Sequence, residues 1–255
     1  MVEIKTDAAL DAMRVAGRVV ADILRETRAT AAVGIRLSEL DDVAREVLRA
    51  AGATSPFLNY RPSFASIPFP AAICVSVNDA VSHGIPGDYR LRDGDLVSVD
   101  CGAQVEGWTG DAAVSFSVGT PRPGDQELLK ATEGALEAGI AAALVGARIG
   151  DISHAVGTTG RAAGFGILED FGGHGIGRRM HEEPSVPNEG RPGRGYPLRH
   201  GLAIAIEPML IAGGGDAYYT APDGWTLRTS DGSRAAHFEH TVAVTDEGPR
   251  VLTAP

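Results

Sequence analysis

The sequence has few cysteines, few aromatic residues and no long apolar run. Its two cysteines, Cys74 and Cys101, are too few for a disulfide framework in a chain of 255 residues. The longest apolar stretch, residues 138–147, is well short of the roughly 18 residues that a bilayer span requires. The acidic start, with Glu3, Asp7 and Asp11, is not typical of a signal peptide. We therefore expect a soluble protein, with the cytoplasm as its location.

Positive charge is also scarce. The chain has 23 Lys and Arg residues against 33 Asp and Glu residues, which gives a net charge of −10. A negative surface repels phosphate backbones and anionic lipids, and no basic cluster is longer than the pair Arg178 and Arg179. We expect neither nucleic acid nor membrane as a direct partner. The hydrophobic content of 44% is enough for a sizeable folded core.

The hydrophobic pattern predicts two pairs of helices that are separated by short strands. Apolar residues three and four apart predict a helix over residues 7–28, and a capping box formed by Ser38 and Asp41 predicts a second helix that ends at Gly52. A similar pair is predicted at residues 126–144 and 151–163. The predicted strands are residues 73–77, 96–101, 112–118, 203–209 and 238–244.

An internal duplication relates the two halves of the chain. YRLRDGDLVSVD at residues 89–100 matches YPLRHGLAIAIE at residues 196–207, and VGIRLSEL at residues 33–40 matches VGARIGDI at residues 145–152. A repeat this long indicates two fused half-domains and not a solenoid. We expect one catalytic domain made of two related halves, at about residues 5–120 and 123–253. Its fold class is α+β, with an antiparallel sheet covered by two pairs of helices in pseudo-two-fold symmetry.

The first half contributes two aspartates to the expected meeting point of the halves. Asp100 ends one predicted strand, and Asp111 begins the next. A hairpin centred between Val105 and Glu106 would place the two carboxylates directly opposite each other. Like charges across a ladder are destabilising, so we expect a cation, most economically a divalent metal, between them.

The second half offers a matching set of side chains. The duplication makes Glu207 the equivalent of Asp100, and Glu239 lies in the last long predicted strand. His174 lies between glycines, which allow a close approach of the backbone. Four carboxylates and one imidazole form an oxygen-rich site that suits two divalent ions better than a structural zinc held by thiolates.

Several motifs together resemble the type I methionine aminopeptidases, over residues 5–253. The motifs are CVSVNDAVSHGIP, DGDLVSVDCG, GWTGD, FGGHGIGRRMHEEPSVPN, AIAIEPM, DGWTLRT and FEHTVAVT. The resemblance implies the duplicated pita-bread fold and a dinuclear metallohydrolase. Such an enzyme removes the N-terminal methionine from nascent polypeptides, preferentially when the next residue is small. The short separation of His181 and Glu207 leaves no room for a long insertion, as expected of type I.

The resemblance also assigns roles to individual residues. Five residues would bind two divalent ions (Co, Mn, Fe, Zn or Ni), with the second and the last bridging them: Asp100, Asp111, His174, Glu207 and Glu239. Glu207 would also act as general base, His181 would stabilise the oxyanion, and His83 would contact the scissile amide nitrogen. Asp100 and its metal would hold the free amino terminus of the substrate.

The expected pocket for the methionine side chain departs from the family pattern. By resemblance it is lined by Phe69, Cys74, Met180 and Trp225. Met180 replaces the usual Phe, the loop at residues 63–70 is one residue short and lacks the usual Tyr, Ala112 replaces a Thr, and His237 replaces a Gln. These changes concern substrate preference. Because a methionine side chain is flexible and polarisable, Met180 can still pack against a methionine substrate.

Other histidines and the second cysteine have simpler interpretations. We expect His154 and His200 to be solvated at the surface, and Cys101 to point into the core on the opposite face from Asp100. His240, next to Glu239, either orients that ligand by hydrogen bonding or has no role at the site.

Two other functions remain as alternatives. An X-Pro aminopeptidase or prolidase shares the fold and the ligand types, although such enzymes usually carry a large additional N-terminal domain. A binding module of the same fold without catalysis is the non-enzyme alternative, and the complete set of ligands and histidines argues against it. No feature requires a partner chain, so we expect a monomer that acts on the N-termini of nascent peptides near the ribosome.

Overall fold

The computed structural model describes residues 2–63 and 65–255; Met1 and Phe64, the latter in the 63–70 loop, lie outside the described residues. The helices are α1 (Asp7–Thr30), α2 (Leu37–Ala50), α3 (Asp125–Ala141) and α4 (Ile149–Ala162). The strands are β1 (Ile73–Val77), β2 (Ala80–Ser82), β3 (Asp95–Val105), β4 (Trp108–Val118), β5 (Gly166–Ile167), β6 (Gly172–Gly175), β7 (Glu182–Pro187), β8 (Ala203–Ile206), β9 (Met209–Ile211), β10 (Tyr218–Thr220), β11 (Leu227–Thr229), β12 (Ala235–His237), β13 (Glu239–Thr245) and β14 (Gly248–Val251). The predicted order of helix pairs and strands is confirmed.

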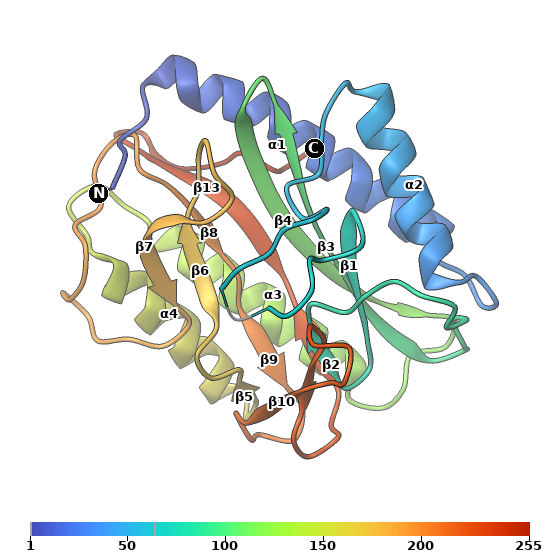
Figure 1. The fold of residues 1–255 in the computed structure, drawn as a ribbon. Helices are drawn as coiled ribbons and strands as arrows, with labels where there is room; N and C mark the ends of the chain where they lie inside the picture. Colours follow the sequence, from blue (N-terminus) through green and yellow to red (C-terminus); the bar gives the residue numbers. More distant parts are fainter. Residues whose placement is uncertain (1, 64) are drawn as a thin grey trace.

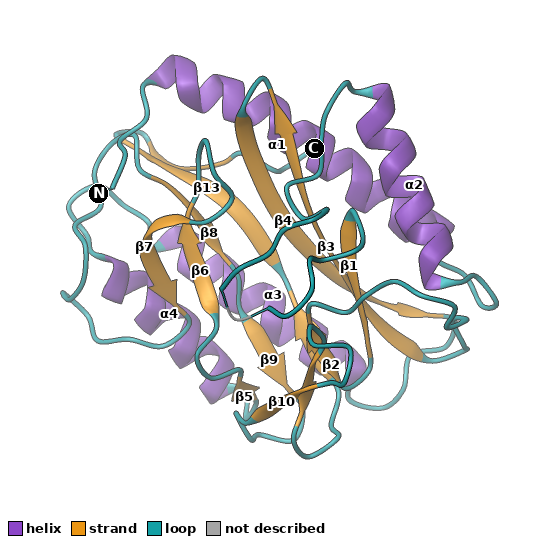
Figure 2. Cartoon of the chain, in the orientation of Figure 1, coloured by secondary structure: helices purple, strands orange, loops and turns teal. Residues whose placement is uncertain are grey.

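One antiparallel sheet joins the two halves of the chain. Its strand order is β1-β3-β4-β13-β8-β6-β7, with β14 paired to β13. The junction between the halves is the pairing of β4 with β13. In Figure 1, α1 passes behind β4, and α3 and α4 lie behind the strands of the second half. Figure 2 shows the resulting arrangement of helices behind a curved sheet.

Each helix pair packs mainly on the strands of its own half. In the first half, Ile23 and Leu40 are fully buried in one cluster with Val97 of β3. In the second half, Ile152 and Ile204 are buried in an equivalent cluster. Burial of each such side chain contributes about 1.5–3 kcal/mol. None of the helices in the described ranges is both long enough and apolar enough to span a membrane.

The internal duplication of the sequence appears again in the backbone. An isolated bridge joins Arg36 to Arg90 in the first half, and the equivalent bridge joins Arg148 to Pro197 in the second. Both bridges precede the second helix of their pair. The helix ends also match, because Gly52 follows α2 and its counterpart Gly164 follows α4, each with a positive φ. The two halves therefore share one local architecture.

The start of α2 differs from the prediction. The capping box joins Arg36 to Glu39, whose carboxylate accepts a hydrogen bond from the Arg36 amide at 2.8 Å. Ser38 and Asp41 form no such box. Asp41 instead accepts hydrogen bonds from the amides of Ala72 and Ile73, so this buried carboxylate connects α2 to the start of β1.

The centre of the β3–β4 hairpin lies one residue beyond the predicted centre, so every cross-strand partner moves by two residues. Val105 pairs with Trp108, so the turn is centred on Glu106 and Gly107, which have φ values of 49° and 78°. A two-residue type I′ turn requires a positive φ at both central positions, and glycine adopts it readily. Asp111 is therefore not directly opposite Asp100, and the predicted face-to-face pair is wrong.

The predicted strand at residues 203–209 is interrupted. β8 ends at Ile206 and β9 begins at Met209 in a different sheet. Pro208, between them, has no amide hydrogen to donate to a ladder. The interruption leaves Glu207 at the end of β8, outside both strands.

Candidate metal centre

Three carboxylates share one face of the sheet because of the register around Ala113. Ala113 in β4 pairs with Asp100 in β3 on one side and with Glu239 in β13 on the other. Asp111 lies two residues from Ala113 along β4, and side chains two apart point to the same face. The aspartates are thus diagonal neighbours on one face of the sheet, and the small Ala113 side chain lies between Asp100 and Glu239.

Glu207 and His174 reach the same place from the far side of β13. His240 pairs with Ile206, so Glu239 and Glu207 are adjacent positions at the end of that ladder. The Nε2 atom of His174 lies 3.6 Å from Glu207 Oε1. Its Nδ1 lies 2.9 Å from the carbonyl oxygen of Gly175, which can only accept. Nδ1 therefore carries the proton, and Nε2 keeps its lone pair for a ligand.

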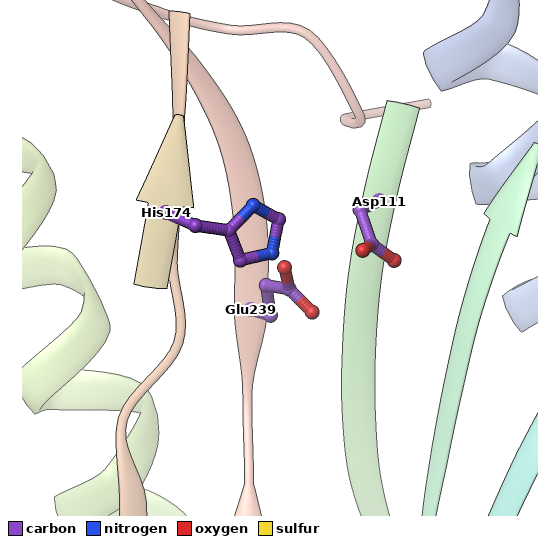
Figure 3. A group of neighbouring side chains, drawn as sticks. All are labelled: Asp111, His174 and Glu239. Atoms are coloured by element: carbon purple, nitrogen blue, oxygen red, sulfur yellow. The ribbon is translucent and has the colours of Figure 1, made fainter. Parts of the chain in front are cut away.

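Figure 3 shows side chains from β4, β6 and β13 pointing toward one another. The donor atoms of Asp111, His174 and Glu239 lie within 4.8 Å of one another. A second group with the same spacing consists of Glu207, His237 and Glu239. Because Glu239 belongs to both groups, the geometry offers two neighbouring positions for a cation that share one carboxylate.

Unpaired buried polar atoms test whether these residues fit a cation. Among the described residues, the buried side-chain atoms without a hydrogen-bond partner include four at this site: Asp100 Oδ1, Asp111 Oδ1, His237 Nε2 and Glu239 Oε1. An unsatisfied buried polar atom is costly, and several in one place call for an explanation such as a bound ion. Oxygen and imidazole donors suit divalent transition metals. The residues present fit such ions.

The electrostatics of the carboxylates lead to the same conclusion. Burial raises the pKa of Asp111 to about 7, and burial together with the charge of Asp111 raises the pKa of Glu207 to about 8. The pKa values of Asp100 and Glu239 are also raised, first by burial and then by the neighbouring carboxylates. Without a cation, crowded buried carboxylates retain protons. A divalent ion would offset this repulsion.

The neighbouring imidazoles, in contrast, have lowered pKa values. Burial, followed by the proximity of His181, lowers the pKa of His174 to about 3. Burial, followed by the proximity of His83, lowers the pKa of His237 to about 3. Both rings are neutral at neutral pH, which is the state that ligates metals.

The metal centre lies in the wall of a cavity of about 370 Å³. The cavity brings together every residue that the sequence singled out for the site: Phe69, Cys74, His83, Asp100, Asp111, His174, Met180, His181, Glu207, Trp225 and Glu239. It therefore combines a polar end with an apolar end.

The apolar end is formed by side chains from distant parts of the chain. Phe69, Cys74, Met180 and Trp225 are all buried in one cluster with Phe57. Phe69 meets Trp225 edge to face, with ring centroids 5.1 Å apart. Burial, followed by the charge of Asp100, raises the pKa of the Cys74 thiol well above its usual range, so the thiol stays neutral. An apolar side chain of a ligand fits this end.

Two histidines lie between the polar and apolar ends. His83 has a φ of 56°, which is uncommon for a residue other than glycine. Its ring contacts those of Phe171 and Trp225, and burial lowers its pKa to about 4. Residues held in such backbone conformations cluster at functional sites. The ring of His181 is 4.3 Å from that of His174 and lies at the exposed mouth of the cavity.

Two residues at the site were not given a role from the sequence. The hydroxyl group of Tyr60 lies 3.1 Å from Nδ1 of His181, and Tyr60 lines the cavity. His237 was noted only as a departure from the family pattern, yet its Nε2 lies 3.7 Å from Glu207 and 3.9 Å from Glu239. No periodicity marks Tyr60. The departure at His237, two residues before a predicted ligand, was a usable signal.

The remaining histidines and Cys101 lie away from the cavity. His154 is exposed, and Cys101 is buried in the core of the first half, as predicted. His200 is only partly solvated, because its Nε2 lies 2.8 Å from Asp7, and this contact raises its pKa. His240 places Nδ1 at 2.8 Å from the hydroxyl of Thr253, away from the ligands.

Comparison with known proteins agrees with these features. The profile of metallopeptidase family M24 matches residues 11–246. Methionine aminopeptidase 1 of Mycobacterium tuberculosis is 53% identical over 251 residues, which cover 96% of this chain and 92% of that protein. The crystal structure of methionine aminopeptidase from Thermotoga maritima superposes with a TM-score of 0.95 at 39% identity, with complete coverage of both chains.

A more distant structural relative shows how far the fold extends. Prolidase from Pyrococcus furiosus has a TM-score of 0.77 at 21% identity, and the match covers 99% of this chain but 65% of that chain. This likeness concerns the pita-bread fold alone. The family match, the high identity over nearly full length and the superposition agree. The chain belongs to the methionine aminopeptidases of metallopeptidase family M24.

Proposed function

We propose that this protein is a type I methionine aminopeptidase that removes the N-terminal methionine from polypeptides, preferentially when the next residue is small. One observation carries the proposal: unpaired donor atoms fit for two divalent ions lie in the same cavity as an apolar pocket. The ions would bind near the peptide bond, and the pocket would receive the first side chain. The two halves together would form a single catalytic domain.

The proposed ligands of the two ions are Asp100, Asp111, His174, Glu207 and Glu239, with Asp111 and Glu239 shared. Their oxygen and imidazole donors support Co, Mn, Fe, Zn or Ni. When bound, such ions act as Lewis acids that polarise a carbonyl group and lower the pKa of water. The Asp100 carboxylate would help to hold the free amino group of the substrate, which selects the chain terminus.

The chain's own side chains would carry the proton transfers. Glu207, whose carboxylate lies in the wall of the cavity, would accept a proton from the attacking water as general base. His181, at the mouth of the cavity, would donate a hydrogen bond to the carbonyl oxygen as negative charge develops on it. His83 would contact the scissile amide nitrogen. Phe69, Cys74, Met180 and Trp225 would enclose the methionine side chain and exclude water.

The setting of the reaction is also a proposal. We infer that the enzyme acts as a monomer on nascent chains in the cytoplasm, near the ribosome, without contacting nucleic acid or membrane. The net charge of −10 supports the absence of such contacts.

Peptide hydrolysis after metal reconstitution tests the function. The protein is stripped with a chelator, reconstituted with Mn, Fe, Co, Zn or Ni, and incubated with Met-Ala-Ser, Met-Leu-Ser and an Ala-Pro peptide. We expect free methionine from Met-Ala-Ser only when metal is present, and much less from Met-Leu-Ser. The chelated protein is the matched control.

The other outcomes select the alternatives. Cleavage before proline alone would identify an X-Pro peptidase of the same fold. Inertness with every metal, in protein that still binds the ions, would favour a binding module.

A further inference from the structure

His237 is a buried polar residue beside the proposed ligands that the proposed mechanism does not use. Its side chain is 2% exposed, and among the described residues its Nε2 has no hydrogen-bond partner. The nearest charged atoms are Glu207 Oε2 at 3.7 Å and Glu239 Oε2 at 3.9 Å. The ring is therefore directed at two proposed metal ligands without bonding to either.

These distances suit common ligation better than hydrogen bonding. A nitrogen-to-oxygen hydrogen bond is about 2.7–3.2 Å long. Two donors that each lie about 2.1 Å from one ion can be up to about 4.2 Å apart. The gaps around His237 fall between these limits, as does the 3.6 Å gap between His174 Nε2 and Glu207 Oε1. The distance from His237 Nε2 to Glu207 is thus similar to that from His174, which is a proposed ligand.

The backbone of His237 is held from two sides, which fixes the point from which its side chain projects. Its amide donates to Ser115 Oγ at 2.9 Å, and Ser115 Oγ lies 2.8 Å from its carbonyl oxygen. Ser115 in turn bonds Ser98 at 2.7 Å. On the other side, His237 pairs with Met209 between β12 and β9. A preorganised donor of this kind is what a metal site requires.

We propose that His237 is a sixth metal ligand, which binds through Nε2 to the ion shared by Glu207 and Glu239. This inference rests on the proposed dinuclear centre and adds to it an imidazole at a position where the family pattern has glutamine. Imidazole favours Zn, Fe, Ni and Cu over the harder ions that carboxylates and water suit, such as Mn. His237 would therefore shift the preference of this protein away from manganese.

X-ray absorption spectroscopy of the cobalt-loaded protein counts imidazole ligands directly. Wild-type protein with two bound Co²⁺ ions should show two imidazoles, from His174 and His237. In His237→Gln, which restores the residue usual in the family, the imidazole signal per ion should fall by about half. The exposed His154→Gln is the matched control and should leave the signal unchanged.

Titration calorimetry with each metal provides a second measurement. Loss of this donor should weaken Co²⁺ binding by about 10-fold or more. Because a manganese ion gains less from imidazole, Mn²⁺ affinity should fall less, and the ratio of the two affinities should change. A purely structural role of His237 would weaken both metals alike.

Two kinds of failure are distinguishable. Wild-type protein that binds two ions and releases methionine, but shows one imidazole, would overturn the role of His237 and leave the proposed function intact. Counting the imidazole ligands of the wild-type protein requires no variant, so this test remains valid even if His237→Gln folds poorly. Protein that binds no divalent ion would overturn both proposals.

Discussion

The two halves of the chain hold their helices by the same backbone hydrogen bonds. In the first half, the amide of Gly34 donates to Leu91, and the amide of Leu37 donates to Tyr89. The equivalent bonds in the second half run from Gly146 to Leu198 and from Ile149 to Tyr196. All of these bonds use main-chain groups, so they survive extensive change of side chains.

The strands that carry the ligands differ between the halves. In the first half, β3 and β4 have 11 residues each and are joined by the tight turn at Glu106 and Gly107. In the second half, β8 has 4 residues and β13 has 7, and residues 207–238 run between them. That longer connection holds β9 to β12, Trp225 and His237.

The two halves share a scaffold but contribute different side chains to the site. The first half supplies a regular hairpin that presents two aspartates, whereas the second half supplies both proposed imidazole ligands and part of the apolar wall. We conclude that the repeated backbone joins the two halves in one sheet at β4 and β13, and that the irregular connection adds Trp225 to the cavity wall.

The largest expected effect tests whether the halves contribute equally to the metal centre. Asp111→Asn in the first half and Glu239→Gln in the second should each lower kcat/KM by more than about 100-fold, because each would remove a shared ligand worth several kcal/mol of transition-state stabilisation. Steady-state release of methionine measures this effect. Asp42→Asn, an exposed change of the same charge on α2, should have no effect. Wild-type turnover in either variant would refute its bridging role.

The pH dependence of stability in metal-free protein is the next largest effect. Asp111 and Glu207 have folded-state pKa values of about 7 and about 8. Their unfolded values are about 4, so they favour the folded state at low pH and lose this contribution as pH rises. The pKa values of His174 and His237 are lowered to about 3. These two rings therefore add to the stability of the folded state as pH rises to about 6.5, the usual pKa of histidine. Above that pH, the carboxylates are the groups of the candidate metal centre that still titrate.

The melting temperature of chelator-treated protein should therefore fall from about pH 6.5 to about pH 8. Saturating Mn²⁺ should reduce this fall, because a bound ion keeps the carboxylates charged in the folded state. Thermal unfolding in both conditions is the measurement, and Asp111→Asn should flatten the curve of the metal-free protein. A metal-free protein whose melting temperature rises over this range would contradict the expected crowding of the two halves' carboxylates.

A smaller effect concerns Tyr60, which connects the first half to His181 of the second. If its hydroxyl donates to Nδ1, His181 is held in the tautomer that can donate from Nε2 to the substrate. Tyr60→Phe should then lower kcat by about 10-fold with little change in KM, since the hydrogen bond to the oxyanion matters only in the transition state. Tyr219→Phe, at an exposed position, is the control. A change confined to KM would show that Tyr60 only shapes the cavity.

The scaffold could be predicted from the sequence because its signals are local and repeated. Amphipathic spacing located the first helix, signals at the helix ends located the second, and a similar pair was found in the second half. The match of residues 33–40 with residues 145–152 indicated the duplication. Positions of single turns were harder. The turn at Glu106 and Gly107 depends on a positive φ at both positions, which the glycine only suggests, and moving its centre by one residue moves every cross-strand partner by two.

The site was predictable in part for a different reason. The resemblance to a family brought together residues such as Asp111 and Glu239, which lie far apart in the sequence and on neighbouring strands of the sheet. It gave no role to His237, where this chain departs from the family pattern, or to Tyr60, which lies in a loop. Their contacts depend on how the loop around Tyr60 and the connection at residues 207–238 pack, and no periodicity encodes that packing.

The smallest expected effect tests the equivalence of the scaffolds. Gly52 and Gly164 end matching helices with positive φ, and an added Cβ would meet no atom within 4 Å at either position. Substitution by alanine therefore adds only backbone strain, about 1 kcal/mol in each half. Chemical denaturation should show equal losses, and methionine release should not change. Gly134→Ala, in the interior of α3 with open space around it, should instead stabilise by about 0.5–1 kcal/mol. Unequal losses at Gly52 and Gly164 would mean that the two helix ends contribute differently to the free energy of unfolding. The halves would then differ in scaffold as well as in chemistry.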